Sequence, residues 1–487
     1  MFWLRTANWL RVGVVLMIVA GCEAPPPPEQ VVNPPPQPQP PANPDPVHFA
    51  EDRLRSPLLE GLRQQIENSE TDETRQSTSP LRQQLASADE IMSEARQKNR
   101  AAIQQANRQV RMGTARQSPS LVVLTVDRMG VADLSTAGQT HWQTPALDRL
   151  AANGLRFSRC YSGLNPTSSR SSLLTGHFNP VANSARAAVM LPKILWNAGY
   201  KTALIGEWPR ELSPASLGYE ESSGWNVAPD RFPDGALLNG KRISLENNSA
   251  GKREISKTDF LISEVRSFLR DAQVRPQQFF LHVSIRVFDD LADRSLSVAD
   301  YASRIQEVDT ATGRVLDALD EFGLGNRTCV WFLSLAGPLP ALTDLIRETR
   351  SVGDLAHSKT GLKEGNLRVP LIVSWPGQIS AGAVSETISG PCDHLPTLAQ
   401  LACVSRPIGR VDGNSLLEVL RHNSPIQERR IVWQADDGRI QAVLEKNWKA
   451  VAGDANQFQL FDLNSDPAEE NDVAAGKSDV LRRLIGN

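Results

Sequence analysis

From residue 118 onwards, short apolar runs alternate with longer amphipathic segments. The first run, at 121–126, is almost wholly apolar and uninterrupted, and such a run is typical of a strand buried on both faces of a parallel sheet. It leads directly into Asp127. Further apolar runs lie at 202–205, 279–285, 328–333 and 370–375, and helical patterns lie between them at 145–153, 191–198, 259–271 and 301–322. This alternation predicts an α/β fold, with a mostly parallel central sheet flanked by helices.

The pattern changes on both sides of this region. Strand-like runs at 430–434 and 441–445 come before a charged terminal helix, so we expect a small C-terminal subdomain. On the N-terminal side the chain is polar, and Leu58, Leu62 and Ile66 recur every four residues. This spacing predicts a helical stalk. A partner-binding coiled coil is the alternative, although apolar heptad positions do not persist.

The N-terminus carries a targeting signal. Arg5 and Arg11 precede an apolar run at 12–20, which leads into Val-Ala-Gly-Cys at 19–22. These features describe a secretory signal peptide, and the run is too short to span a bilayer. Val-Ala-Gly-Cys also resembles the bacterial lipobox, which implies a lipid anchor on Cys22. An ordinary signal peptide and a retained membrane anchor are the alternatives.

A proline-rich segment follows the expected anchor. Its composition cannot form a core and favours extended polyproline, so it predicts a spacer, with a ligand for proline-recognition domains as the alternative. Glu23, rather than Asp, follows the cysteine, and this resembles lipoproteins that are routed to the outer membrane of a Gram-negative bacterium. The expected organisation is a lipoprotein signal peptide at 1–21, a Pro-rich linker at 22–47, a polar helical stalk at 48–117, the α/β domain at 118–425 and the C-terminal subdomain at 426–487.

Composition narrows the classes of function. The chain has 487 residues, a net charge of -3 and 22% charged residues, which gives no support for nucleic-acid binding. Apart from Cys22, the cysteines are Cys160, Cys329, Cys392 and Cys403, and none has the Cys-x-x-Cys spacing of a zinc site. We expect them to be small buried apolar residues or, in an exported protein, to form a disulfide.

Short motifs occur in a fixed order along the α/β region. The most specific, at 165–176, reads Asn-Pro-Thr-Ser-Ser-Arg-Ser-Ser-Leu-Leu-Thr-Gly. Others are Thr-Pro-Ala-Leu-Asp-Arg-Leu-Ala at 144–151, Ala-Gly-Tyr-Lys-Thr-Ala at 198–203, Arg-Val-Pro at 368–370, Asp-His-Leu-Pro-Thr at 393–397 and Leu-Phe-Asp-Leu at 460–463. Together they resemble the sulfatase family of the alkaline-phosphatase superfamily. The resemblance implies that superfamily's sheet, a calcium ion and a formylglycine nucleophile.

The resemblance places Pro166 at the nucleophile position. The family converts a Cys or Ser there to formylglycine, whereas proline has no side-chain heteroatom to oxidise, ionise or bind metal. Thr167 and Ser168 flank the position and are fallback hydroxyls, but the sequence shows no base that would activate either of them. His394 lies in the Asp-His-Leu-Pro-Thr motif and is expected to be structural. A Ser-His-Asp arrangement elsewhere stays open, without a recognisable nucleophile context.

The implied metal site is also substituted. The family's adjacent aspartates correspond to Asp127 and Arg128, and its later ligand pair corresponds to Leu335 and Ala336. Hard cations need oxygen ligands, and only Asp127 offers one here. We therefore expect no bound metal and no other cofactor. We expect Arg128 to supply the missing positive charge by pairing with Asp127. The apolar side chains of Leu335 and Ala336 are expected to fill the former ligand volume.

Of the remaining pocket positions, some are substituted and others keep the residue types of the family. The family's Lys-Trp-His corresponds to Glu207-Trp208-Pro209, which loses a lysine and a histidine, and the histidine expected near 286–288 has no clear counterpart. Arg170 and Lys359 keep the family's residue types, as Asp127 does. The resemblance places all three in the pocket, where Lys359 corresponds to a sulfate-contacting lysine. Solvated or ion-paired bases are the alternative for Arg170 and Lys359.

The sequence therefore favours an exported, lipid-anchored, non-catalytic pseudo-sulfatase with a binding or structural role. Candidate partners are the membrane through the N-terminal lipid, and a sulfated glycan or a protein. A divergent sulfuric-ester or phosphoester hydrolase is the competing hypothesis.

Overall fold

The computed structural model describes residues 118–178, 190–209, 213–226, 231–275, 277–288, 296–404, 409–424, 426, 429–435, 437–453 and 457–486. All of them belong to one unit, residues 101–487. The expected signal peptide, Cys22 anchor, linker and stalk lie outside the described residues. Within these ranges, no helix is long and apolar enough to cross a membrane.

A ten-stranded sheet with the order β10-β2-β9-β8-β1-β7-β3-β4-β5-β6 forms the centre of the α/β domain. Strands β8, β1, β7, β3 and β4 are mutually parallel, which confirms the mostly parallel sheet. The strands are β1 (Ser120–Val126), β2 (Leu155–Phe157), β3 (Lys201–Glu207), β4 (Glu221–Trp225), β5 (Gly235–Leu238), β6 (Lys241–Ser244), β7 (Phe279–Ile285), β8 (Thr328–Ser334), β9 (Leu371–Ser374) and β10 (Ala383–Ser385).

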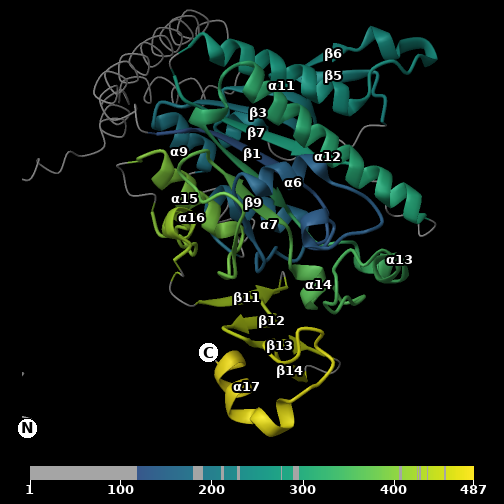
Figure 1. Cartoon of the computed structure of the whole chain (residues 1–487), viewed down its shortest axis with the longest axis vertical. Helices are drawn as coiled ribbons and strands as arrows, with labels where there is room; N and C mark the ends of the chain where they lie inside the picture. The colour runs from purple at the N-terminus through teal and green to yellow at the C-terminus, as the bar shows by residue number, and fades with distance from the viewer. Residues whose placement is uncertain are drawn as a thin grey trace, which may run out of the picture. The chain divides into compact units, whose positions relative to one another are not determined.

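Helices cover both faces of this sheet. Figure 1 shows α11 and α12 on one side and α9, α15 and α16 on the other. The helices are α6 (Pro145–Ala152), α7 (Pro166–Thr175), α9 (Leu191–Asn197), α10 (Pro214–Leu217), α11 (Lys257–Gln273), α12 (Val298–Glu321), α13 (Thr343–Thr349), α14 (Glu364–Leu367), α15 (His394–Leu401), α16 (Leu417–His422) and α17 (Ser478–Ile485). Short 3-10 helices are η2 (Ser135–Ala137), η3 (Glu246–Gly251), η4 (Gly325–Arg327), η5 (Pro340–Leu342), η6 (Pro391–Asp393) and η8 (Ala474–Lys477).

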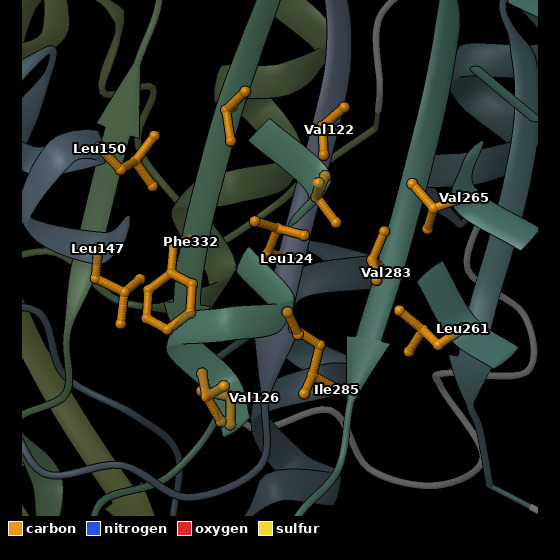
Figure 2. Packing of buried hydrophobic residues seen from close by; sticks show 14 of the residues in the cluster. Val122, Leu124, Val126, Leu147, Leu150, Leu261, Val265, Val283, Ile285 and Phe332 are labelled. Carbon is orange, nitrogen blue, oxygen red and sulfur yellow. The ribbon is translucent and has the colours of Figure 1, made fainter. Parts of the chain in front are cut away.

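Alternate side chains of β1 pack against the helices on opposite faces of the sheet. Val122, Leu124 and Val126 pack with residues of α6, α11 and α12, as Figure 2 shows for part of this cluster. Leu121 and Val123 point the other way and pack with residues of α7, α9 and α15. Successive side chains of a strand face opposite sides, so a strand buried on both faces must be apolar throughout. This is why the uninterrupted run predicted β1 correctly.

The predicted strand at 370–375 has a different orientation from its neighbours. It forms β9, which runs antiparallel to both β8 and β2. A buried apolar run looks the same in either direction, so the sequence pattern could not give the orientation.

A second, antiparallel sheet follows in the C-terminal region. It contains β11 (Arg430–Gln434), β12 (Ile440–Glu445), β13 (Trp448–Ala452) and β14 (Phe458–Asp462) in that order. Figure 1 draws it in yellow, with α17 beside it. One face packs on α17, and Trp433 on the other face lies in a buried cluster with Tyr161 and Phe178 of the α/β domain.

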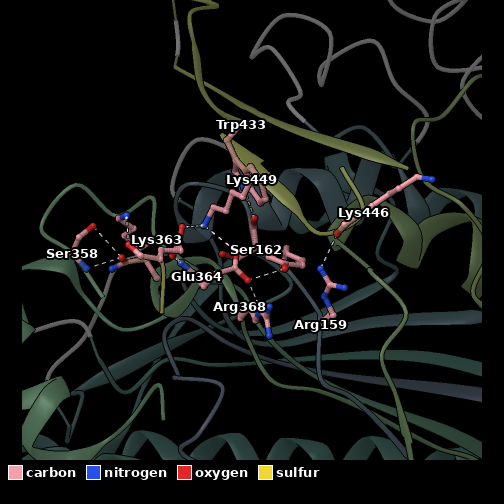
Figure 3. Close-up of polar contacts among 12 residues, drawn as sticks. Arg159, Ser162, Ser358, Lys363, Glu364, Arg368, Trp433, Lys446 and Lys449 are labelled. Atoms are coloured by element: carbon pink, nitrogen blue, oxygen red, sulfur yellow. Dashed lines mark hydrogen bonds and ion pairs between the residues drawn. The ribbon is translucent and has the colours of Figure 1, made fainter. Parts of the chain in front are cut away.

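Charged side chains are buried where the second sheet meets the α/β domain (Figure 3). Lys449 Nζ lies 2.9 Å from Glu364 Oε1 and 3.1 Å from Glu469 Oε1, and all three side chains are 0% exposed. Arg368 also pairs with Glu364, and Tyr161 donates a hydrogen bond to it. Burial alone raises the pKa of Glu364, but Lys449 and Arg368 outweigh burial and hold that pKa at about 2. These five residues are called the junction cluster.

Candidate functional site

Charged residues follow three neighbouring parallel strands at one edge of the sheet. Asp127 comes directly after β1, Arg286 directly after β7, and Glu207 ends β3. Since β7 lies between β1 and β3, Arg286 emerges between the two carboxylates. The carboxyl ends of strands are the usual ligand-binding edge of an open α/β sheet.

Two arginines occupy both carboxylate oxygens of Asp127. Arg170 Nη2 lies 2.9 Å from Oδ1, and Arg286 Nε lies 2.8 Å from Oδ2. The side chain of Asp127 is 9% exposed and that of Arg286 is 33% exposed. Arg170 comes from α7, on the side of the sheet that Leu121 and Val123 face. Alternation directs Asp127 to that same side, within reach of α7.

Glu207 belongs to the same group of charges. Its Oε2 lies 3.8 Å from Arg286 Nη1, and its Oε1 lies 3.5 Å from Lys257 Nζ, at the first turn of α11. Arg286 therefore bridges carboxylates from the strands on either side of its own. The strand-end cluster is defined as Asp127, Arg128, Arg170, Glu207, Lys257 and Arg286.

Arg128 does not form the expected ion pair with Asp127. Across the described residues it takes part in no hydrogen bond or ion pair, and it is half-buried. Burial lowers the pKa of Arg128, Asp127 raises it, and nearby Arg286 lowers it further. Adjacent residues direct their side chains differently, so arginines from α7 and β7 reach the Asp127 oxygens instead.

The position that the resemblance assigns to the nucleophile begins α7. Pro166 is the first helical residue and Asn165 is its N-cap. Asn165 Oδ1 accepts from Ser168 N at 2.9 Å, while Ser168 Oγ accepts from Asn165 N at 3.2 Å and donates to Asn165 O at 2.9 Å. Ser168 is thus part of a capping box. Thr167 is exposed, and no described acidic or basic side chain bonds to either hydroxyl.

A buried histidine lies beneath this edge. His282 of β7 contacts Thr125 Oγ1 at 3.0 Å and Tyr219 Oη at 2.8 Å through its two ring nitrogens. Burial, with a smaller contribution from Arg170, lowers its pKa to about 3. Both nitrogens are engaged and the ring is neutral, so His282 is not placed as a general base for Thr167 or Ser168. His394 is equally buried, against Trp331, in agreement with a structural role.

The remaining substituted positions offer no metal-binding oxygen from their side chains. Leu335 and Ala336 are buried, and Leu335 lies in the apolar cluster beneath α7. Their backbones bond to the end of β1 and the loop after it, through Leu335 N to Val126 O at 2.8 Å and Met129 N to Ala336 O at 3.1 Å. The expectation that apolar atoms line this position agrees with the packing.

The residues at the edge do not fit a divalent cation. A hard cation takes several oxygen ligands, and both oxygens of Asp127 already contact guanidinium nitrogens. Within the described ranges, no group of three or more His, Cys, Asp or Glu side chains could hold a metal. Formylglycine likewise has no precursor side chain at Pro166.

The structure brings together some predicted pocket residues and not others. Asp127, Arg170 and Glu207 lie in one charge network. Lys359 is exposed before α14 and forms no interaction with the strand-end cluster among the described residues. Pro209 is partly exposed beyond the end of β3.

Sequence reasoning missed Arg286 and Lys257. The available signal was the position of Arg286, a charge directly after a buried strand.

The four cysteines considered after Cys22 are free, with Cys403 exposed and the other three buried.

Comparisons with known proteins agree with this architecture. A family model described as sulfatase matches residues 119–404, and one described as N-sulphoglucosamine sulphohydrolase, C-terminal, matches 357–483. Rat N-acetylgalactosamine-6-sulfatase is 30% identical over 357 residues, which span 63% of this chain and 66% of the rat protein. The match thus spans just under two thirds of that relative.

Solved structures share the fold. A Bacteroides thetaiotaomicron protein described with the metabolism of multiple glycosaminoglycans has a TM-score of 0.65 and 22% identity, covering 76% of this chain and 98% of its own. A Pseudoalteromonas sulfatase has a TM-score of 0.60 and 22% identity, covering 77% and 89%. The family match spans more than half of the sequence, and the chain therefore belongs to the sulfatase family, in the alkaline-phosphatase superfamily.

Proposed function

We propose that this sulfatase-family chain is a non-hydrolytic pseudo-sulfatase that binds sulfated glycans weakly through its strand-end cluster. One observation carries the proposal: arginines occupy both oxygens of Asp127, the one surviving metal-ligand type, so no cation site is left there. Pro166 at the nucleophile position and the capping role of Ser168 support the same conclusion. No metal and no formylglycine take part in this function.

The charge of the cluster supports an anionic ligand. Arg170 and Arg286 pair with the carboxylate of Asp127, and Arg128 follows it in the chain without a hydrogen-bonding or ion-pairing partner among the described residues. Guanidinium groups donate paired hydrogen bonds to sulfate or phosphate oxygens. The rat relative is an N-acetylgalactosamine-6-sulfatase, which favours a sulfated glycan over other anions. A protein partner is the other candidate for the binding role.

The proposed setting is the outer membrane of a Gram-negative bacterium. The lipobox-like Val-Ala-Gly-Cys at 19–22 supports acylation of Cys22 after removal of residues 1–21. Mass spectrometry of the mature N-terminus tests this directly. An unmodified Cys22, or a retained apolar segment, would contradict the anchor.

The competing function is a divergent sulfuric-ester or phosphoester hydrolase, and the activities named for the relatives favour it. Elemental analysis after dialysis and chromogenic sulfate and phosphate esters separate the two functions. We expect no stoichiometric calcium or magnesium and no turnover. Turnover that disappears in Thr167→Val or Ser168→Ala would establish the hydrolase instead.

Ligand binding needs its own experiment. Calorimetry with sulfated oligosaccharides and their desulfated counterparts should show weak binding of the sulfated form alone, declining with added salt. Equal binding of both forms would contradict recognition of the sulfate groups.

A further inference from the structure

Three buried side chains form a closed ring of contacts beneath the loop that follows β1. Asp133 Oδ1 lies 2.5 Å from Ser351 Oγ, Ser351 Oγ lies 3.0 Å from Tyr301 Oη, and Tyr301 Oη lies 2.8 Å from Asp133 Oδ2. Gly130 N also donates to Asp133 Oδ2, at 2.6 Å. Asp133 and Ser351 are 0% exposed and Tyr301 is 1% exposed, so the ring is closed to bulk water.

The number of protons in this ring indicates the state of the carboxyl group. Each of the three oxygen contacts needs one proton, and the hydroxyl groups of Ser351 and Tyr301 supply two. When Asp133 is a carboxylate, both hydroxyls donate to it and the contact between Ser351 and Tyr301 holds no proton. When Asp133 is a neutral acid, it donates to Ser351, Ser351 donates to Tyr301, and Tyr301 donates back to Oδ2. The neutral acid therefore satisfies all three contacts.

The environment of Asp133 favours the same state. Burial raises its pKa from 3.8 to about 7, although its three hydrogen bonds act in the opposite direction. Tyr301 is the other titratable group in the ring, and burial, followed by the charge of Asp133, holds its pKa well above the ordinary value. Tyr301 therefore stays neutral, and the carboxyl group is the member of the ring that titrates.

The charged residues on the surrounding elements are engaged elsewhere. On α12, Arg304 bonds to a backbone carbonyl after β7, and beside Ser351 the surface residues Arg350 and Asp354 pair with each other. In the loop itself, the pKa of Arg128 responds to burial, Asp127 and Arg286, and not to Asp133. His141, near the end of the same connection, is exposed. Among the described residues, no cation is thus placed to hold Asp133 as a carboxylate.

The ring fastens the loop to the rest of the domain. The loop, called the β1 loop, comprises residues 128–134. Ala132 N donates to Ser351 O at 3.0 Å, and Trp142 Nε1 donates to Asp133 O at 2.9 Å. Gly130 passes so close that a Cβ there would lie 2.1 Å from Ser351 O. The β1 loop can therefore separate from α12 and from residue 351 only by breaking the ring.

We propose that Asp133, Ser351 and Tyr301 form a proton-operated latch, which holds the β1 loop closed while the carboxyl group is neutral and lets the loop open once its proton has passed to solvent. Opening admits water to the carboxylate and relieves the cost of a buried charge without a cationic partner. The β1 loop begins directly after Asp127, so the latch makes this edge of the sheet sensitive to pH. The inference does not depend on the proposed function.

The direction of the pH effect follows from the two states of the loop. The closed loop binds the proton with a pKa of about 7, whereas an open loop exposes an ordinary aspartic acid with a pKa near 3.8. Opening should therefore become about tenfold more favourable per pH unit from pH 5 to pH 7. Above pH 7 the carboxyl group is ionised in both states, and the effect should level off.

Hydrogen exchange of the full chain tests the latch, expressed as protection factors so that the intrinsic pH dependence of exchange cancels. Amides of the β1 loop should lose protection from pH 5 to pH 7 in wild type. Asp133→Asn should show no such loss, because its amide donates to Ser351 as the neutral acid does. Asp309→Asn is the matched control, since it replaces a buried carboxylate on the same helix as Tyr301 that accepts only from the backbone of α6, and it should respond as wild type does.

Two further variants complete the test. Asp133→Ala also cannot titrate, so its loop should be less protected than wild type at pH 5 and equally independent of pH, which decides the matter if the Asn variant does not fold. Tyr301→Phe opens the ring and keeps the carboxyl group. It should lower protection of the β1 loop at pH 5 about tenfold, through the loss of hydrogen bonding.

Each contrary outcome overturns a stated part of the proposal. Protection that stays constant from pH 5 to pH 7 in wild type, or falls equally in the Asp133 variants, rules out the latch. Loop amides that are as strongly protected as those of β1 and β8 at every pH would show that the loop opens only in global unfolding, which also rules it out. Unchanged protection in Tyr301→Phe at pH 5 would contradict the closed ring.

Discussion

The molecule buries two groups of ionic side chains that differ in charge balance and access to solvent. In the junction cluster, Glu364 and Glu469 face Lys449 and Arg368, and the side chains of Glu364, Glu469 and Lys449 are 0% exposed. In the strand-end cluster, two arginines pair with Asp127, and the side chain of one of them, Arg286, is 33% exposed.

This difference distinguishes charged side chains that stabilise the fold from charged side chains that are available to bind a ligand. Buried ions cost desolvation energy, so they persist only when partners balance them, and the junction cluster meets that condition. Glu364 of α14 has two cationic partners, and Lys449 of β13 joins it to Glu469 in the segment after β14. The strand-end cluster keeps a half-buried arginine without a partner among the described residues, which a soluble anion could neutralise.

The largest expected effect comes from breaking the balance at the junction. Lys449→Met leaves Glu469 and Glu364 partly uncompensated in a dry interior. We expect the free energy of unfolding to fall by about 3–5 kcal/mol, measured by chemical denaturation. Lys241→Met, at an exposed position on β6, should stay within about 0.5 kcal/mol of wild type.

The compensating variant tests the same balance. Lys449→Met combined with Glu469→Gln removes one charge of each sign and leaves the pair of Glu364 and Arg368. Most of the lost stability should return. A double variant as unstable as the single one would mean that Lys449 acts through packing and not through charge.

Another buried carboxylate sharpens the comparison, because Asp133 accepts hydrogen bonds only from neutral groups, namely Gly130 N, Tyr301 Oη and Ser351 Oγ. Burial, partly offset by those bonds, raises its pKa from 3.8 to about 7. The folded state therefore keeps a proton that the unfolded chain has lost. This contribution is complete below about pH 4 and is lost as pH rises through 7. From pH 5 to pH 7 the loss is roughly 2 kcal/mol.

Asp133→Asn should remove this pH dependence, since an amide resembles the protonated acid. Unfolding measured at pH 5, 6, 7 and 8 for both proteins gives the difference, and contributions from other groups cancel. Parallel curves for wild type and variant would show that Asp133 does not titrate in this range.

A smaller effect is expected at the strand-end cluster. Asp127→Asn removes the charge-assisted hydrogen bond from Arg170 and the ion pair with Arg286, and should cost about 1–2 kcal/mol at low salt. Sulfate should restore much of this stability, because an anion takes over the charge of the carboxylate. Glu469→Gln in the closed junction cluster should show no such rescue. Equal rescue of both variants would remove the distinction between the two clusters.

The fold was largely predictable from the sequence because burial on two faces demands unbroken apolar runs. The strands β1, β3, β7 and β8 follow from that rule. The orientation of β9 did not follow, and neither did β13 and β14. Pairing direction depends on distant partners, and the short antiparallel strands are only partly buried, which weakens their pattern.

The site was only partly predictable. Motif order placed Asp127 and Arg170 in one region, and the structure joins them by an ion pair. The sequence could not show that Arg286 would take the remaining oxygen, since that contact depends on β7 lying between β1 and β3. Adjacency in the chain made Arg128 the obvious partner, but adjacent side chains diverge in space.

The smallest expected effect distinguishes the strand-end cluster from the helix that supports it. Ser168 closes the capping box at the start of α7, whereas the side chain of exposed Thr167 forms no hydrogen bond among the described residues. Ser168→Ala should lower the free energy of unfolding by about 0.5–1 kcal/mol, and Thr167→Val should leave it nearly unchanged. Neither variant should alter sulfate binding, because the anion contacts belong to arginines. A loss of sulfate binding in Ser168→Ala, at unchanged stability, would move this hydroxyl from the helix cap into the binding site.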